Sequence, residues 1–284
     1  ENAGSFLQNL RKEIDARQKW LETVLTGEKK WILENQGPEG EFYMNGSKAG
    51  DVNPYFACMA ALGLLAETKN CPITETEKKA VGRYLDWHTG ILLETDGKMG
   101  IYRKKSGKLI YKEKADSEDG YLGMYLFLMG KYLEKTESTD LPEYWKKGIS
   151  LALKKIQSLM QDGITQVSEE NTTVYLMDNL EVWKGLYELE HAGLKDVQAI
   201  REMRNKLQAQ IEKLFWDDAN QRWRIIENSD LYHQKEFYPD GVAQIYPLIY
   251  EFPVKEKKKQ KILYKQFTER FQWQKLNKKR NGFL

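Results

Sequence analysis

The sequence predicts an all-α fold, a toroid in which helices alternate between an inner and an outer ring. Three observations carry this prediction. Helical periodicity runs along the whole chain, and helices that are apolar on every side alternate with helices that have one charged face. A cluster of acids and aromatic rings also recurs about once per pair of helices. A ring of helical hairpins produces this alternation, whereas a simple bundle would make all its helices amphipathic.

Length and composition restrict the partners of the chain. Its 284 residues are enough to bury a substantial core, and no Pro- or Ser-rich linker divides them, so we expect one domain over residues 1–284. A net charge of +2 offers no field for nucleic acid or for an anionic membrane, and no apolar run is long enough to span a membrane. We therefore expect a monomer without a nucleic-acid partner and without membrane insertion.

The expected elements follow the alternation in chain order. The predicted helices are an outer one that ends at 37–40 with a break near Gly27, an inner one at 54–67, and then segments 73–93, 121–133, 142–160, 174–189, 197–214, 242–250 and a basic amphipathic one within 255–280. Residues 97–112 predict a β-hairpin around Ser106 and Gly107. The pattern gives about five outer and four inner helices, and we expect the ring to lack a last inner helix at 281–284.

Four clusters open the inner helices, at positions 51, 116, 178 and 238, with steps of 65, 62 and 60 residues. Inner helices that run parallel place their N-termini at one mouth, so the clusters are expected to face a common funnel. The expected members are Asp51, Asn53, Asp116, Asp119, Asp178, Glu181 and Asp240, with Tyr55, Tyr121, Tyr175 and Tyr238. Carboxylates mixed with flat rings are typical of a carbohydrate site.

A structural interpretation competes with the functional one for three of these acids. Asp51, Asp116 and Asp178 each precede an apolar helix, and Asp is a favoured N-cap residue. Asp119 and Glu181 would instead lie one turn inside helices that otherwise avoid charge, where an unpaired carboxylate is costly. These two are therefore the more informative acids.

The spacing also bears on mechanism. Asp116 with Asp119, and Asp178 with Glu181, are i,i+3 pairs, whose side chains are expected to lie close together on one helix face. An inverting glycosidase needs its two carboxyls roughly 6.5–9.5 Å apart. A pair taken from different clusters is thus the better candidate for an inverting acid and base.

Other chemistry is poorly supported. His88, His191 and His233 are scattered without metal-ligand spacing, and no phosphate loop, dinucleotide fingerprint or nucleophile elbow is present, so we expect no metal and no cofactor. Cys58 and Cys71 are expected to be unpaired.

Four segments carry a family resemblance. These are Asp-Val-Asn-Pro-Tyr-Phe-Ala (51–57), Ala-Asp-Ser-Glu-Asp-Gly-Tyr (115–121), Tyr-Leu-Met-Asp-Asn-Leu-Glu-Val-Trp-Lys-Gly-Leu (175–186) and Tyr-Pro-Asp-Gly-Val-Ala-Gln (238–244). Together they resemble the six-hairpin (α/α)6 glycosidase-like superfamily, nearest to the inverting glycoside hydrolase families 8, 48 and 126. The resemblance implies an (α/α)6-type toroid that handles glycans in a secreted or cell-surface setting.

The resemblance to family 8 is incomplete. That family has a segment of the type Ala-(Ser/Thr)-Asp-(Ala/Gly)-Asp, in which an Asp lies at the sugar ring where the bond is cleaved. Ala115 and Asp119 fit the ends of the segment, while Asp116-Ser117 reverses its middle order. The family's general acid, a Glu at the start of the first inner helix, is absent here. Asp51 could replace it, or the acid could have moved to Glu181 or been lost.

The first hypothesis is therefore an inverting glycoside hydrolase that acts on a polysaccharide or oligosaccharide in an open cleft. Asp119 and Glu181 form the expected catalytic pair, and Asp51 is a further catalytic candidate. The expected substrate-binding residues are Asp116, Asp178, Asp240, Asn53, Tyr55, Tyr121, Tyr175 and Tyr238. A non-catalytic glycan-binding protein on the same fold is the alternative. A polysaccharide lyase or sugar epimerase ranks lower, because no His falls within a cluster.

Overall fold

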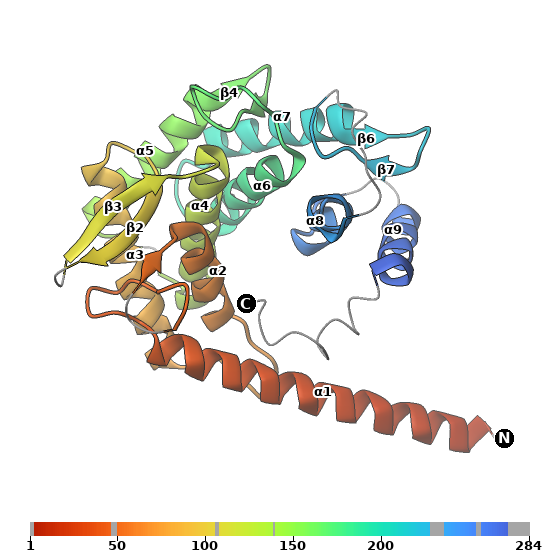
Figure 1. The fold of residues 1–284 in the computed structure, drawn as a ribbon. Helices are drawn as coiled ribbons and strands as arrows, with labels where there is room; N and C mark the ends of the chain where they lie inside the picture. Colours follow the sequence, from red (N-terminus) through yellow and green to blue (C-terminus); the bar gives the residue numbers. More distant parts are fainter. Residues whose placement is uncertain are drawn as a thin grey trace.

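The computed structural model describes residues 3–46, 50–105, 108–138, 140–227, 236–253 and 257–271. In this part of the chain the helices form an open ring (Figure 1). The outer helices are α1 (Ala3–Glu34), α3 (Glu75–Glu94), α5 (Glu143–Leu159), α7 (Gln198–Phe215) and α9 (Lys257–Phe271). The inner helices are α2 (Pro54–Leu64), α4 (Glu118–Thr136), α6 (Leu176–His191) and α8 (Val242–Ile249). The predicted toroid is confirmed, while the expected lack of a last inner helix falls on 281–284, outside the described residues.

Burial explains which helices lie inside. Twelve of the 19 residues of α4 and twelve of the 16 residues of α6 are buried, against four of the 18 residues of α7. The inner helices α4 and α6 are therefore covered on nearly every side, as their apolar sequence predicts, whereas α2 and α8 leave side chains such as Phe56 and Ile249 exposed. None of the described helices is both long enough and apolar enough to cross a membrane.

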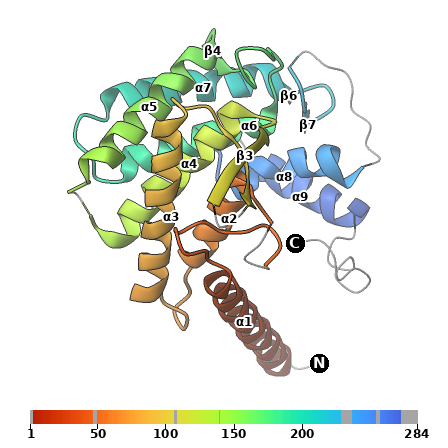
Figure 2. The same ribbon diagram turned by 60° about the vertical axis from the view of Figure 1, so that its left-hand side comes forward.

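Helix α1 corrects one prediction. It continues through Gly27 without the expected break, since a single Gly costs a helix only about 1 kcal/mol relative to Ala. The N-terminal part of α1 projects from the ring in both views (Figures 1 and 2). Apolar side chains such as Ile14 and Leu21 are accordingly more than half exposed there.

Helices α4 and α6 form the tightest contact of the ring, and glycines make it possible. A Cβ on Gly123 would lie 2.6 Å from the backbone N of Val182, and one on Gly185 would lie 2.3 Å from the carbonyl O of Gly123. Only a residue without a side chain allows two backbones to approach this closely. The same close contact brings the start of α6 against the start of α4.

In the part of the chain that the structure describes, three small antiparallel sheets connect helices of the ring. Strands β1 (Asp51–Val52), β2 (Gly100–Lys105) and β3 (Lys108–Lys114) form one sheet in that order, with Asp51 opposite Arg103. The others are β4 (Met160–Gln161) with β5 (Ile164–Thr165), and β6 (Trp216–Asp217) with β7 (Arg222–Trp223). The hairpin predicted at 97–112 is confirmed, although its turn at Ser106 and Gly107 lies outside the described residues. Cys58 and Cys71 are free, as predicted.

Candidate active site

The residues that cap the inner helices are not the predicted ones. The side chain of Asn53 accepts from the backbone N of Tyr55 at 2.9 Å, and the hydroxyl of Ser117 accepts from the backbone N of Gly120 at 3.2 Å. Tyr175 is the N-cap residue of α6, and its side chain makes no capping hydrogen bond. The capping interpretation of Asp51, Asp116 and Asp178 is therefore wrong, because each carboxylate lies one to three residues away from the capping position.

Glu181 lies at the floor of the mouth, on α6, and is 2% exposed. Its Oε1 accepts hydrogen bonds from the hydroxyls of Tyr55 and Tyr250, the latter at 3.5 Å. Its Oε2 points toward Gly120, where a Cβ would lie only 2.7 Å away. Burial, and then the neighbouring Asp178, raise the pKa of Glu181 well above its usual range.

Asp178 is the neighbour of Glu181 on the same face of α6. Its Oδ1 lies 3.5 Å from the same Cβ position on Gly120, which confirms that this i,i+3 pair comes together. Asp178 remains partly exposed to the mouth. Burial raises its pKa well above the usual range, the charge of Asp119 adds to the rise, and a hydrogen bond from Ser117 opposes it. Asp178 is thus the member of the pair that faces solvent.

Asp119 is fully buried, and described groups bond both of its carboxyl oxygens. Oδ1 accepts from the hydroxyl of Ser117 at 2.8 Å and from the backbone N of Gly120 at 2.9 Å, while Oδ2 lies 2.8 Å from Oγ1 of Thr165. Burial raises the pKa of Asp119 to about 6 against these hydrogen bonds. The predicted pairing with Asp116 is wrong, since Asp116 is exposed and precedes α4.

Three of the predicted tyrosines surround this group of carboxyls. The hydroxyl of Tyr121 has Asn53 and Asp116 as hydrogen-bond partners. Tyr238 is 65% exposed, and its pKa is raised by partial burial and then by the charges of Asp178 and Asp116. Tyr55 is partly buried under the mouth, with its ring 5.6 Å from that of Tyr121. Tyr238 therefore presents an exposed ring beside the carboxyls, whereas Tyr121 is buried and Tyr55 is partly covered.

Asp51 and Asp240 stand apart from this group. Asp51 accepts from Nε of Arg103 at 2.6 Å and from Nζ of Lys112 at 2.8 Å, and these hydrogen bonds lower its pKa to about 2. A carboxylate held ionised in this way does not suit a general acid. Asp240 is 4% exposed, and its Oδ2 has no hydrogen-bond partner among the described residues.

Several polar side chains of the site were not predicted. Tyr246 lies on α8 and Tyr250 caps its C-terminus, and the hydroxyl of Tyr246 is 3.3 Å from that of Tyr55. Thr165 on β5 and Asn179 on α6 are fully buried beside Asp119. The i,i+4 spacing of two tyrosines in an otherwise apolar helix was the available signal, although the same pattern is typical of core packing.

Among the described residues, the cluster formed by the carboxyls of Asp119, Asp178 and Glu181 has no cationic partner. Within the described ranges, no Lys, Arg or His forms an ion pair with Asp119, Asp178 or Glu181, and the basic residues beside the mouth, Arg103 and Lys112, pair with Asp51. Across the same residues, no group of three His, Cys, Asp or Glu side chains is placed to hold a metal ion. The pKa values of Asp119, Asp178 and Glu181 are all raised, so protonation reduces the charge of this cluster.

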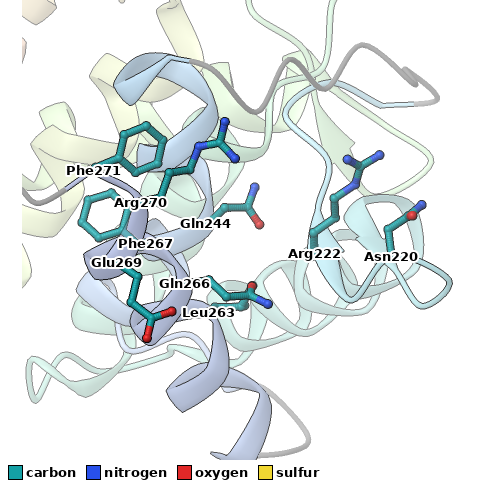
Figure 3. Close-up of a pocket in the computed structure, with 9 residues that line it drawn as sticks. All are labelled: Asn220, Arg222, Gln244, Leu263, Gln266, Phe267, Glu269, Arg270 and Phe271. Carbon is teal, nitrogen blue, oxygen red and sulfur yellow. The ribbon is translucent and has the colours of Figure 1, made fainter.

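A separate cavity lies between α8, α9 and the turn from β6 to β7 (Figure 3). Its volume is about 470 Å³. Its lining residues are Asn220, Arg222, Gln244, Leu263, Gln266, Phe267, Glu269, Arg270 and Phe271. None of the predicted site residues lines it, and the amide of Gln244 bonds the backbone of Trp223. The cluster of Asp119, Asp178 and Glu181 therefore lies outside this cavity.

Comparison with solved structures places this arrangement among known folds. A structure described as a wild-type glycosidase matches with a TM-score of 0.55 and 12% identity, over 74% of this chain and 61% of that one. The fold is glycosidase-like. A rhamnosidase from Klebsiella oxytoca with rhamnose bound matches with a TM-score of 0.51 and 10% identity, over 76% of this chain and 40% of that one. A variant of the first glycosidase in complex with glucose matches with a TM-score of 0.52.

The chain thus spans about three fifths of the glycosidase and two fifths of the rhamnosidase. No family model matches the sequence, and no curated protein matches it. The fold supports the broad resemblance to glycosidases, while the link to families 8, 48 and 126 stays a prediction.

Proposed function

We propose that this protein is a glycoside hydrolase that acts on a polysaccharide or oligosaccharide at the mouth of the ring. The observation that carries the proposal is the pair Asp178 and Glu181, two adjacent carboxyls whose pKa values are both raised and which lie beside the hydroxyl of Tyr55 and the exposed ring of Tyr238. A general acid must hold its proton near neutral pH, and burial beside a second carboxyl provides this.

The geometry suggests a different division of roles from the one expected. Asp178 is the candidate proton donor, because it is partly exposed whereas Glu181 is 2% exposed. Glu181 lies behind it. Burial, and then the charges of Asp119 and Asp116, disfavour the ionised form of Asp178. Asp116 is the candidate base, since it is exposed beside Tyr121 and comes from a different cluster. An inverting mechanism would place a water between Asp116 and Asp178.

The test is hydrolysis by the purified chain and its variants. Glucosides and rhamnosides are the first substrates to try, since matched structures hold glucose and rhamnose. We expect Asp178→Asn and Asp116→Asn each to reduce kcat about 100-fold or more, the typical contribution of general acid–base catalysis. Glu143→Gln, a carboxyl-to-amide change at a 72% exposed position on α5, is the matched control and should retain activity. Full activity in Asp178→Asn would contradict the assignment.

The stereochemistry needs its own measurement. Proton NMR of the fresh product would show inversion of the anomeric centre if Asp116 activates a water across the sugar from Asp178. Retention would contradict the inverting mechanism while leaving hydrolysis in place.

One observation supports the alternative, a non-catalytic glycan-binding protein. Asp51 lies where the family resemblance would place the general acid, and its ion pairs with Arg103 and Lys112 keep it ionised. Saturable binding on a glycan array, with no release of reducing ends from the bound glycans, would favour this alternative over hydrolysis.

A further inference from the structure

The hydroxyl of Thr165 contacts two oxygen atoms but has only one proton to donate. Its Oγ1 lies 2.8 Å from Oδ1 of Asn179 and 2.8 Å from Oδ2 of Asp119. A threonine hydroxyl carries one hydrogen, so it can donate a full hydrogen bond to only one of these oxygens. If both neighbours are acceptors, two oxygens face each other at 2.8 Å without a hydrogen between them.

The orientation of the Asn179 amide is fixed by three other groups. Its Nδ2 donates to the carbonyls of Thr165 and Tyr175, each at 2.9 Å, and its Oδ1 accepts from the backbone N of Thr165 at 2.9 Å. If the amide N and O were exchanged, the NH2 group would face the backbone N–H of Thr165, and the amide oxygen would face the carbonyl oxygens of Thr165 and Tyr175. Oδ1 of Asn179 is therefore an acceptor, and the missing proton must come from Asp119.

We propose that Asp119 is a neutral, protonated carboxylic acid in the folded protein at neutral pH. Its proton lies on Oδ2 and is donated to Oγ1 of Thr165, whose own proton goes to Oδ1 of Asn179. Oδ1 of Asp119 then accepts from Ser117 and from the backbone N of Gly120, so each described contact has one donor and one acceptor.

The surroundings agree with this assignment. The titratable groups that face Asp119 are Asp178 and Glu181 from α6, and both are acids. Burial raises the pKa of Asp119 to about 6 with the Thr165 hydroxyl donating to it. When that hydroxyl donates to Asn179 instead, the ionised form loses a stabilising bond and the pKa lies higher.

A neutral Asp119 would be a positioning residue for Asp178. The hydroxyl of Ser117 has both Asp119 and Asp178 as partners, and it has one proton to give. Because Ser117 donates its proton to Oδ1 of Asp119, it cannot also donate to Asp178, so the ionised form of Asp178 lacks this stabilising bond and Asp178 keeps its proton. This role toward Asp178 rests on the proposed hydrolase function, whereas the proton on Asp119 does not.

The experiment compares the full chain with Asp119→Asn, because Asn reproduces the donors and acceptors of a protonated Asp. Infrared difference spectra at pH 7 should show the carbonyl stretch of one protonated carboxyl in the wild type that is lost in Asp119→Asn. The band should persist in Thr165→Ser and shift in Thr165→Val, which lacks the acceptor. Absence of the band in the wild type would overturn the proposal, whether or not any sugar is hydrolysed.

Thermal denaturation gives a second readout. A carboxyl whose folded pKa lies above its unfolded value of 3.8 loses stability as pH rises through the folded pKa. Asp119→Asn should therefore gain in Tm relative to wild type as pH rises from about 4 to about 8. A relative loss of Tm over that range would show an ionised Asp119 and contradict the proposal. If activity is found, its pH profile should stay in place in Asp119→Asn, since one neutral group replaces another.

Discussion

At the scale of the residue, the site consists of acids kept close together without cations. Glu181 and Asp178 share the space beside Gly120, and the tyrosines around them supply hydroxyls but no charge. A carboxyl with a raised pKa folds most favourably when protonated, so this arrangement reduces stability at higher pH. Such a cost is typical of functional sites rather than of structural cores.

Glu181→Gln tests that cost directly. Gln can still accept from Tyr55 and Tyr250, and it removes the charge that Glu181 would carry at high pH. We expect a higher Tm than wild type at pH 8 and no gain near pH 4, where Glu181 is protonated in both states. Thermal denaturation at the two pH values measures this. An equal change in Tm at both would mean that Glu181 does not titrate as its burial implies.

Asp51→Asn should behave in the opposite sense. The pKa of Asp51 is lowered to about 2 by Arg103 and Lys112, so its contribution to stability is present above its unfolded pKa of 3.8 and is lost as pH falls toward 2. We expect the variant to lose about 0.5–1 kcal/mol at pH 7, the range for partly exposed ion pairs, and nothing near pH 2. Urea denaturation curves give both values. A loss that persists at low pH would point to packing instead of charge.

The sequence predicted that Asp119 and Glu181 point inward, but it did not predict that Thr165 and Asn179 lie beside Asp119. Asp119 and Glu181 stood out because they interrupt apolar helices. Thr165 and Asn179 could not be found in this way, because their importance depends on a strand and a helix that meet only in the folded chain. The ion pairs of Asp51 were missed for a similar reason, since its pairing with Arg103 joins residues 52 positions apart.

At the scale of the element, the α4–α6 contact determines where the site can form. Glu181 faces Gly120 only because Gly123 and Gly185 let the two backbones touch. Periodicity predicted both helices, but it carries no information on which pair would approach most closely. Glycines at 120, 123 and 130 of α4 were a signal that the sequence offered for this contact.

Gly123→Ala is therefore expected to destabilise the protein. Its Cβ would lie 2.6 Å from the backbone of Val182, which cannot move aside as a flexible side chain could, so we expect a loss of about 2–3 kcal/mol. Gly90→Ala on α3 is the matched control, because nothing lies within 4 Å of its Cβ, and it should be neutral or stabilising by up to about 1 kcal/mol. Equal effects of the two substitutions on the free energy of unfolding would contradict this account of the contact.

At the scale of the whole molecule, the ring was predictable because the apolar or amphipathic sequence pattern of each helix indicates whether it is an inner or an outer helix. The alternation gave the inner and outer positions, and the order of the chain then gave the neighbours. Composition could not predict how the charged side chains are distributed over the folded chain. Acids with a lowered pKa, such as Asp51 and Glu190, lie in ion pairs away from the three buried carboxyls.

This distribution predicts an acidic optimum of stability. Raised pKa values at Asp119, Asp178 and Glu181 remove stability as pH rises above about 4, while lowered ones remove it as pH falls below about 4. We expect the free energy of unfolding to be greatest in mildly acidic solution and to fall toward pH 9. The double variant Asp119→Asn with Glu181→Gln should flatten the alkaline side of that curve. A maximum at pH 8 in the wild type would contradict the prediction.

The ion pairs of Asp51 have one more consequence, which concerns ionic strength. They join the hairpin of β2 and β3 to Asp51 in β1, two residues before the cap of α2, so charge helps to hold this edge of the entrance together. Partly exposed ion pairs weaken as salt is added, whereas the glycine-mediated contact beneath the carboxyls does not depend on charge. Added salt should therefore loosen the lip of the opening and leave its base rigid, and under the proposed function the binding of large glycans should weaken before that of small ones.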